Sequence, residues 1–238
     1  LINFAHGDIM MVGGFLGFFG IAVLELPFGA AVLLAIVGSA LLGMASDRIA
    51  YRPLRSAPKI SLLITAIGVS FFLENAFNVF FGGVPRAFPV PAYLENVVDF
   101  VGLTMPISAI IVPIITAFLL AIILWVLYKT KYGMAIRALA FDVGTVNLMG
   151  IDANRIITLV FGMGSALAAV GGIFWAVNYP SVEPMMGVLV GLKAFAAAVV
   201  AAFAAVVARA TRRTGLGKTA GLAFTSVDVD AAVSDLLL

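Results

Sequence analysis

The sequence contains no cysteine and few charged residues. With no cysteine among 238 residues, disulfide bonds and thiolate metal sites are excluded. Charged residues make up 11% of the chain, against about 25% in soluble domains, and there is a single histidine. Hydrophobic residues make up 63%, and the mean hydropathy is +1.17. This composition excludes an ordinary soluble protein and indicates a chain that spans a membrane several times.

Six apolar segments approach or exceed the length of a membrane-spanning helix. A helix rises about 1.5 Å per residue, so about 20 residues cross the roughly 30 Å of hydrocarbon in a bilayer. We therefore predict an all-α fold, a polytopic transmembrane bundle of about six helices. The predicted segments are 9–24, 28–45, 60–81, 105–128, 156–179 and 188–208.

Lysine and arginine gather in alternate connections between these segments. Twelve of the 14 basic residues lie between the second and third segments, between the fourth and fifth, or after the sixth. Because cytoplasmic loops carry the basic excess, we predict that these connections are cytoplasmic and that the intervening loops are external. The external loop 82–104 contains three prolines and the stretch VVDFVG, which predicts a small hairpin.

Polar residues at membrane depth are the first candidates for function, because lipid-facing polar groups are costly. The opening stretch LINFAHGDIMMVGG contains several. Asn3 or Asp8 is placed to cap a helix that begins near Ile9. Together with His6 and Gly7, they predict a helix interrupted in or near the bilayer, where transporters bind substrate carboxylates. The alternative is an ordinary cap at the membrane surface.

Two further polar sites lie within predicted membrane segments. Glu74, followed by Asn75, lies about 21 Å along the third segment, where a lipid-facing carboxylate costs about 2 kcal/mol or more. We predict that it faces a pore or a partner helix; a structural bond to a neighbouring helix is the alternative. For Lys193 we predict an interior ion pair with Glu183 or Glu74, and the alternative is that it extends to the membrane surface.

The connection KTKYGMAIRALAFDVGTVNLMGIDANR is the most informative polar stretch. Asp142 is placed to cap a short helix over 143–149, and Gly150 suits the end of such a helix. Apolar Val146, Leu148 and Met149 on this cytoplasmic helix predict a docking surface. The alternative is a solvated loop.

Several chemistries are excluded. TGLGKT ends like a phosphate-binding loop, but the leading glycine of that motif is replaced by Arg212, and no buried strand precedes it. No nucleophile, base or metal-ligand cluster accompanies His6 and Asp8. We therefore predict neither an enzyme nor a cofactor bound by this chain.

Four stretches carry a resemblance to a known family. LINFAHGDIMMVGGF, AYRPLRSAPKISLLITAIGVSFFLEN, KYGMAIRALAFDVGTVNLMGIDANRI and GLKAFAAAVV resemble the permease subunits of branched-chain amino acid ABC importers, over about residues 1–200. The resemblance implies ATP-driven import of branched-chain amino acids across the bacterial or archaeal inner (cytoplasmic) membrane. It implies as partners a second homologous permease, two ATPase subunits that bind ATP and Mg, and a periplasmic amino-acid-binding protein, but no nucleic acid.

The predicted functional residues fall into two groups. The substrate pathway is assigned to Asn3, His6, Gly7, Asp8, Glu74, Asn75 and Lys193. Coupling to the ATPase is assigned to Arg137, Asp142, Leu148, Gly150, Ile151 and Asp152.

The resemblance also sets expectations for the two ends of the chain. It implies a membrane helix ahead of Leu1, so we expect the chain to begin inside the protein. We predict a permease domain over 1–208 and an atypical cytoplasmic tail over 209–238, which a frameshift near Val200 or disorder would explain.

Other functions stay open at this point. The same scaffold suits an amide, urea or another small solute. An ion-coupled carrier or channel, with Glu74 as the responsive group, and a passive assembly subunit are further alternatives.

Overall fold

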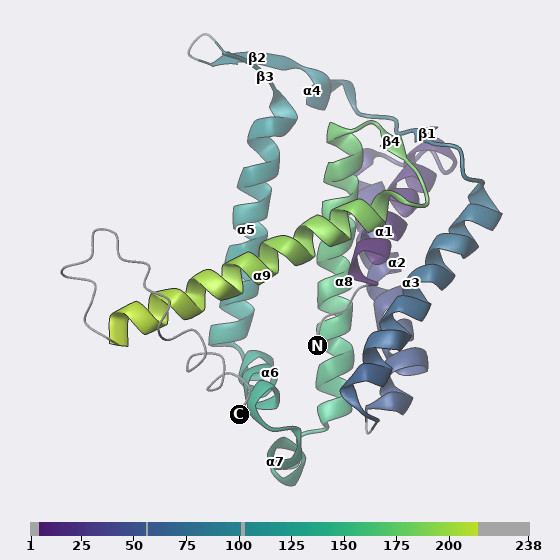
Figure 1. Ribbon diagram of the computed structural model, residues 1–238. Coiled ribbons are helices and arrows are strands. Elements are labelled where there is room, and N and C mark those ends of the chain that lie inside the picture. Colours follow the sequence, from purple (N-terminus) through teal and green to yellow (C-terminus); the bar gives the residue numbers. More distant parts are fainter. Residues whose placement is uncertain (1–4, 56, 101–102, 214–238) are drawn as a thin grey trace. The chain divides into compact units, whose positions relative to one another are not determined.

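The computed structural model describes residues 5–55, 57–100 and 103–213 (Figure 1). The chain divides into two compact units, Leu1–Gly191 and Leu192–Leu238. The described part of the second unit is the continuation of one helix.

Helices make up most of the described chain. The longer ones are α1 (His6–Ala22), α2 (Phe28–Ser46), α3 (Lys59–Phe81), α5 (Ile107–Lys129), α6 (Lys131–Phe141), α8 (Ala153–Asn178) and α9 (Met186–Arg213). The shorter ones are the π-helical η1 (Asp47–Tyr51), the 3₁₀ turn η2 (Arg52–Leu54), α4 (Ala92–Glu95) and α7 (Val143–Leu148). The strands are β1 (Arg86–Ala87), β2 (Val97–Phe100), β3 (Leu103–Pro106) and β4 (Ser181–Val182).

The predicted all-α bundle is confirmed. The six predicted segments correspond to α1, α2, α3, α5, α8 and α9. Five helical spans in the described residues are long and apolar enough to cross a membrane: Phe28–Leu54, Ile60–Phe81, Ile107–Lys129, Ala153–Asn178 and Met186–Val207. Helix α1 is apolar but shorter, at 17 residues. The chain is therefore a multi-pass membrane protein.

Helices α1, α2 and α8 pack closely because small residues face one another where they meet. A Cβ added to Gly13 of α1 would lie 2.4 Å from the Cα atom of Ala169 in α8. A Cβ added to Gly172 of α8 would lie 2.1 Å from the carbonyl oxygen of Met10. No side chain fits at either position without moving a helix, so these glycines set the separation between α1 and α8.

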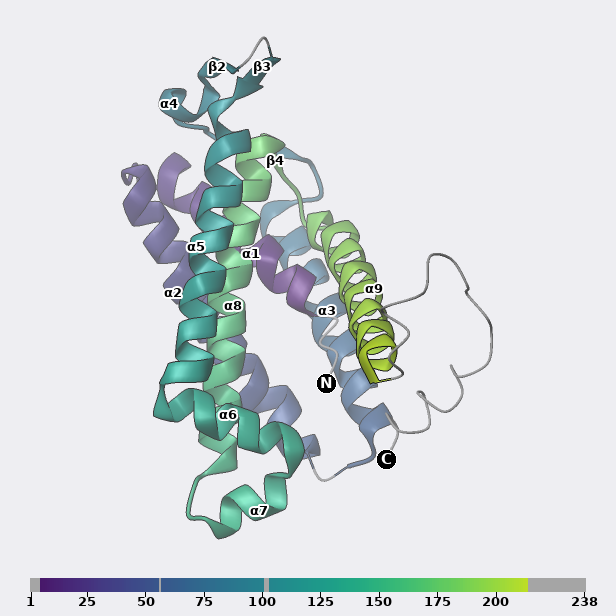
Figure 2. The ribbon, with the colours of Figure 1, turned by 90° about the vertical axis from the view of Figure 1, so that its left-hand side faces the viewer.

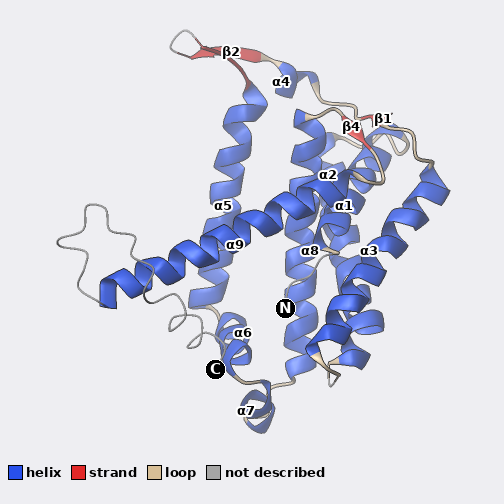
Figure 3. Cartoon of the chain, in the orientation of Figure 1, coloured by secondary structure: helices blue, strands red, loops and turns tan. Residues whose placement is uncertain are grey.

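Short strands gather at one end of the first unit (Figure 3). Strands β2 and β3 form an antiparallel hairpin in which Val97 pairs with Pro106 and Phe100 pairs with Leu103. This confirms the hairpin predicted from the sequence. Strand β1 pairs with β4, which ties the connection after α3 to the connection after α8.

The opposite end of the first unit carries α6 and α7 (Figure 2). The turns η1 and η2 lie at this end too, since Arg55, which follows η2, bonds Asn154 in the first turn of α8. Two of the basic connections identified in the sequence therefore share one end, as a single membrane topology requires.

Candidate functional site

Residues predicted separately in α1 and α3 come together where the two helices meet. The Asp8 side chain is 1% exposed, and Ser70 Oγ of α3 donates a hydrogen bond to its Oδ2. The Glu74 carboxyl group, one turn further along α3, lies beside that of Asp8 and interacts with it. Asp8 Oδ1 is buried and has no hydrogen-bond partner among the described residues. We call Asp8, Ser70 and Glu74 the acidic cluster.

The acidic cluster leaves one buried oxygen of Asp8 without a hydrogen-bond donor among the described residues. A buried acceptor without a donor is costly, so a donor group placed beside Asp8 Oδ1 would be stabilising.

The predicted capping role of Asp8 is wrong. Helix α1 begins at His6, three residues before the predicted start, and Ala5 at its N-cap makes no side-chain cap. Asp8 therefore lies inside the first turn, and its carboxylate bonds Ser70 on another helix. Asn3 lies outside the described residues, so the predicted interruption of the helix stays a prediction.

The neighbours of Asp8 have different surroundings. His6 is exposed. Gly7 is buried against the start of α9, and a Cβ there would lie 2.3 Å from the carbonyl oxygen of Gly187 and 2.9 Å from the Cα atom of Gly191. Gly7 thus has a packing role, which allows α1 and α9 to approach closely.

Asn75 bonds within its own helix, and Lys193 lies in the second unit. Asn75 is exposed, and its Nδ2 donates a 2.7 Å hydrogen bond to the carbonyl oxygen of Phe71 in its own helix. Lys193 belongs to the second unit, where its side chain lies on an exposed stretch of α9. Their assignment to the pathway stays a prediction.

Helix α7 has the termini predicted for it. Asp142 Oδ1 accepts a 2.8 Å hydrogen bond from the Gly144 amide at the N-terminus. At the C-terminus Gly150 has a φ of +79°, and the Ile151 amide bonds the Val146 carbonyl oxygen at 3.3 Å. A positive φ favours glycine, and this bond is typical of a Schellman end.

The apolar side chains of α7 point in two directions. Leu148 is 90% exposed and Met149 is 74% exposed. Val146 is buried, so its predicted place on the docking surface is wrong: it packs α7 against the rest of the protein. The exposed pair leaves an apolar spot at the tip of this end.

Helix α7 is bonded directly to the start of α8. Asn147 Oδ1 accepts a 3.2 Å hydrogen bond from the Ala153 amide. Asp152 caps α8 by accepting hydrogen bonds from the amides of Asn154 at 3.0 Å and Arg155 at 3.3 Å. These bonds join α7 to the first turn of α8.

Arg137 links α6 to α5. Its Nη1 donates a 2.7 Å hydrogen bond to the Leu127 carbonyl oxygen in the last turn of α5, and its guanidinium lies 5.0 Å from the centre of the Tyr128 ring. A cation at a helix C-terminus is favourable. Arg137 thus fixes the bend between α5 and α6.

A second polar cluster was missed by the sequence analysis. Asp47 is 0% exposed; its Oδ1 lies 2.5 Å from Arg55 Nη2, and its Oδ2 accepts a 2.5 Å hydrogen bond from Thr158 Oγ1. Arg55 Nη1 also donates to Asn154 Oδ1. We call these four residues the inner cluster. The available signal was an acid directly after an apolar segment and eight residues before an arginine.

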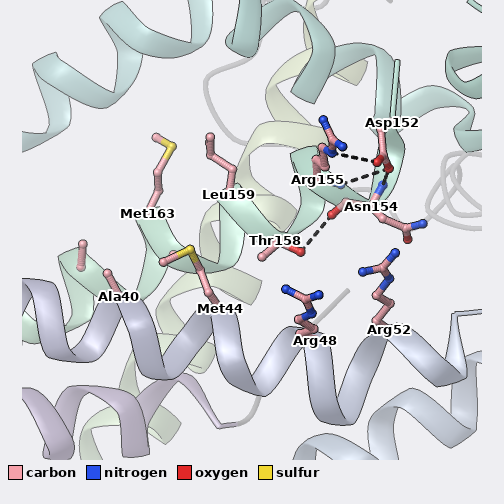
Figure 4. A pocket seen from close by; sticks show the side chains of 12 residues that line it. Ala40, Met44, Arg48, Arg52, Asp152, Asn154, Arg155, Thr158, Leu159 and Met163 are labelled. Carbon is pink, nitrogen blue, oxygen red and sulfur yellow. Dashed lines mark hydrogen bonds and ion pairs between the residues drawn. The ribbon is translucent and has the colours of Figure 1, made fainter. Parts of the chain in front are cut away.

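Two cavities flank α8. One, of about 790 Å³, lies between α2 and α8 beside the inner cluster (Figure 4). The other, of about 730 Å³, lies between α5 and α8 and is lined by apolar residues together with Thr116 and Asn178. The acidic cluster lines neither of them.

Comparison with known proteins identifies the family. The family model described as "Branched-chain amino acid transport system / permease component" matches residues 1–232. The chain belongs to this family. The match runs past Val200, where the resemblance was expected to end, and covers most of the predicted tail. The boundary predicted at 208 stays a prediction.

Two relatives of the permease are named for the same transport system. The high-affinity branched-chain amino acid transport system permease protein BraD of Pseudomonas aeruginosa is 34% identical over 210 residues, which cover 84% of this chain and 68% of BraD. The protein LivH of Escherichia coli, with the same description, is 35% identical over 214 residues, with the same coverage. No solved structure matches the permease.

Proposed function

We propose that the permease is the membrane-spanning subunit of an ATP-driven importer of branched-chain amino acids in the bacterial or archaeal inner membrane. The observation that carries this proposal is α7, a short helix capped at both ends, with Leu148 and Met149 exposed and a direct bond to α8. Such a helix is suited to receive a mechanical input from outside the membrane. The substrate class is supported by the names of BraD and LivH.

The proposed assembly contains a second permease, two ATPase subunits and a periplasmic amino-acid-binding protein. ATP and Mg would bind the ATPase subunits. We place α7 and the basic connections on the cytoplasmic side, since twelve of the 14 lysines and arginines lie in alternate connections. Leu148 and Met149 would contact an ATPase subunit, and Asn147 and Asp152 would pass its movement to α8.

We place the acidic cluster on the substrate pathway. A zwitterionic amino acid carries an ammonium group, which would donate hydrogen bonds to Asp8 Oδ1 and attract the carboxyl groups of Asp8 and Glu74. Because Asp8 is buried in this conformation, access would need α1 and α3 to separate during the transport cycle.

Uptake by the reconstituted complex tests the proposal. We expect permease, its partner subunits and the binding protein in sealed vesicles to accumulate leucine, isoleucine and valine when ATP is supplied to the ATPase side. A non-hydrolysable ATP analogue is the control and should give no accumulation. Uptake of an amide or urea in place of these amino acids would contradict the substrate assignment.

An ion-coupled carrier is the second candidate, and the adjacent carboxyl groups of Asp8 and Glu74 are the observation that favours it. The two candidates differ in their energy source. Uptake that persists without the ATPase subunits and collapses with the proton gradient would support the carrier. Uptake that requires hydrolysis and survives an uncoupler would support the importer.

A further inference from the structure

The cavity between α2 and α8 is graded in polarity along its length (Figure 4). From the α2 side it is lined at four-residue intervals by Ala40, Met44, Arg48 and Arg52. Ala40 and Met44 belong to α2, whereas Arg48 lies in η1 and Arg52 begins η2, so the row continues from the membrane helix into the turns that follow it. The row begins with apolar residues in the membrane segment and ends with two arginines at the basic end.

The wall formed by α8 has the same gradient. Its polar lining residues, at the start of α8, are Asp152, Asn154, Arg155 and Thr158. Its apolar lining residues, deeper in the helix, are Leu159, Gly162, Met163 and Ala166. The cavity thus combines a cationic mouth with an apolar interior.

The arginines at the mouth differ in whether their charge is already paired. Arg155 pairs with Asp152 at 3.1 Å, and Arg55, which does not line the cavity, pairs with Asp47. The side chains of Arg48 and Arg52 make no hydrogen bond or ion pair with any residue in the described part of the chain, and both residues are exposed. Figure 4 shows both guanidinium groups directed toward the start of α8.

We propose that this cavity binds an anionic phospholipid. Its phosphate would bond Arg48 and Arg52, since a guanidinium binds phosphate oxygens through two parallel N–H donors. One acyl chain would lie along the apolar walls between Met44 and Met163. Basic pockets between membrane helices are known to bind such head groups.

The polarity of the cavity selects a lipid over other anions. A free phosphate ion would satisfy the arginines but leave the apolar interior unfilled. In a lipid, the charge lies at the membrane surface and the acyl chain extends inward, and the cavity has the same order. The volume of about 790 Å³ is within the range of roughly 300–1,000 Å³ typical of ligand sites.

The lipid would act on the packing of α2 against α8. Thr158 and Asn154 line the cavity and also belong to the inner cluster, which bonds the end of α2 to the start of α8. A bound lipid is therefore expected to raise the melting temperature of the permease. This inference does not depend on the substrate or on the energy source of transport.

Binding of phosphatidylglycerol to the purified permease in neutral detergent tests the proposal, by native mass spectrometry. We expect the permease to bind phosphatidylglycerol in preference to phosphatidylcholine. The double variant Arg48→Gln/Arg52→Gln should bind it about 30-fold more weakly, since each arginine near the surface contributes about fivefold toward anionic lipid. The control variant Lys129→Gln/Lys131→Gln removes the same charge outside the cavity and should bind normally.

A second variant tests the apolar half. Ala166→Phe fills the interior without changing the charge. This variant should weaken the binding of a dioleoyl lipid, which has long acyl chains, and leave the binding of a short-chain dihexanoyl lipid unaffected. Equal lipid binding by the arginine variant and its lysine control would overturn the proposal. The proposal would also be overturned if inorganic phosphate bound as tightly as the lipid. It would likewise be overturned if the second permease bound the same two arginines and displaced the lipid.

Discussion

Replacing Asp47 with alanine removes the acceptor for two donors at the junction of α2 with α8. Asp47 is fully buried, while the Arg55 side chain is 19% exposed. Removing one member of a buried ion pair costs about 3–5 kcal/mol, because the other charge stays buried and unpaired. Because Arg55 is partly exposed, we expect the loss in free energy of unfolding to lie at the lower end of this range, at about 3 kcal/mol. For a chain of this size that corresponds to a melting temperature lower by roughly 6–12 °C.

A double-mutant cycle in purified permease measures this pair directly. The variants are Asp47→Ala, Arg55→Gln and the combination, and the assay is thermal unfolding. If the two residues interact as described, the double variant is destabilised by less than the sum of the single variants. Arg155→Gln is the matched control: it breaks an exposed pair and should cost at most about 1 kcal/mol. The reasoning would be refuted if the stability lost in the double variant equalled the sum of the losses in the two single variants. It would also be refuted if Asp47→Ala cost no more stability than the Arg155→Gln control.

Three further predictions concern packing, the acidic cluster and α7. Gly13→Ala should lower the yield of folded permease, measured by size-exclusion chromatography, because the added Cβ meets Ala169. Gly171→Ala is the control and should give a normal yield, because nothing lies within 4 Å of a Cβ added there. Glu74→Gln should reduce leucine uptake in vesicles at least tenfold and leave co-purification with partner subunits intact; equal uptake by this variant and wild type would remove the acidic cluster from the pathway. Leu148→Ser should reduce co-purification of the ATPase subunits without lowering the melting temperature, since Leu148 is 90% exposed; normal recovery of the ATPase would contradict docking there.

The elements of the fold that follow local rules were predictable from the sequence. Long apolar runs predicted the helices because lipid leaves few alternatives for the backbone. The hairpin β2–β3 followed from prolines and a short apolar stretch, and the ends of α7 followed from Asp142 and Gly150. In each case the deciding residues lie within a few positions of one another.

The polar clusters depend on contacts between residues far apart in the sequence. Asp8 and Ser70 are 62 positions apart, and Asp47 and Thr158 are 111 apart. Local reasoning assigned Asp8 to a cap, because it could not include the helix that buries it. Asp47 received no role, because one of its two partners, Thr158, lies on a helix far away in the sequence. Helix packing decides which polar residues meet, and hydropathy alone does not encode it.

The central claim is that the bundle crosses the membrane with α7 and the α2–α3 connection on the side of the ATPase. Because the chain contains no cysteine, single-cysteine variants report position without background. Tyr93→Cys, at the end that carries the hairpin, is predicted to react with a membrane-impermeant maleimide in cells whose inner membrane is intact. Arg52→Cys and Leu148→Cys are predicted to react only after that membrane is permeabilised. Labelling of Arg52→Cys and Leu148→Cys from opposite sides of the membrane would contradict the account.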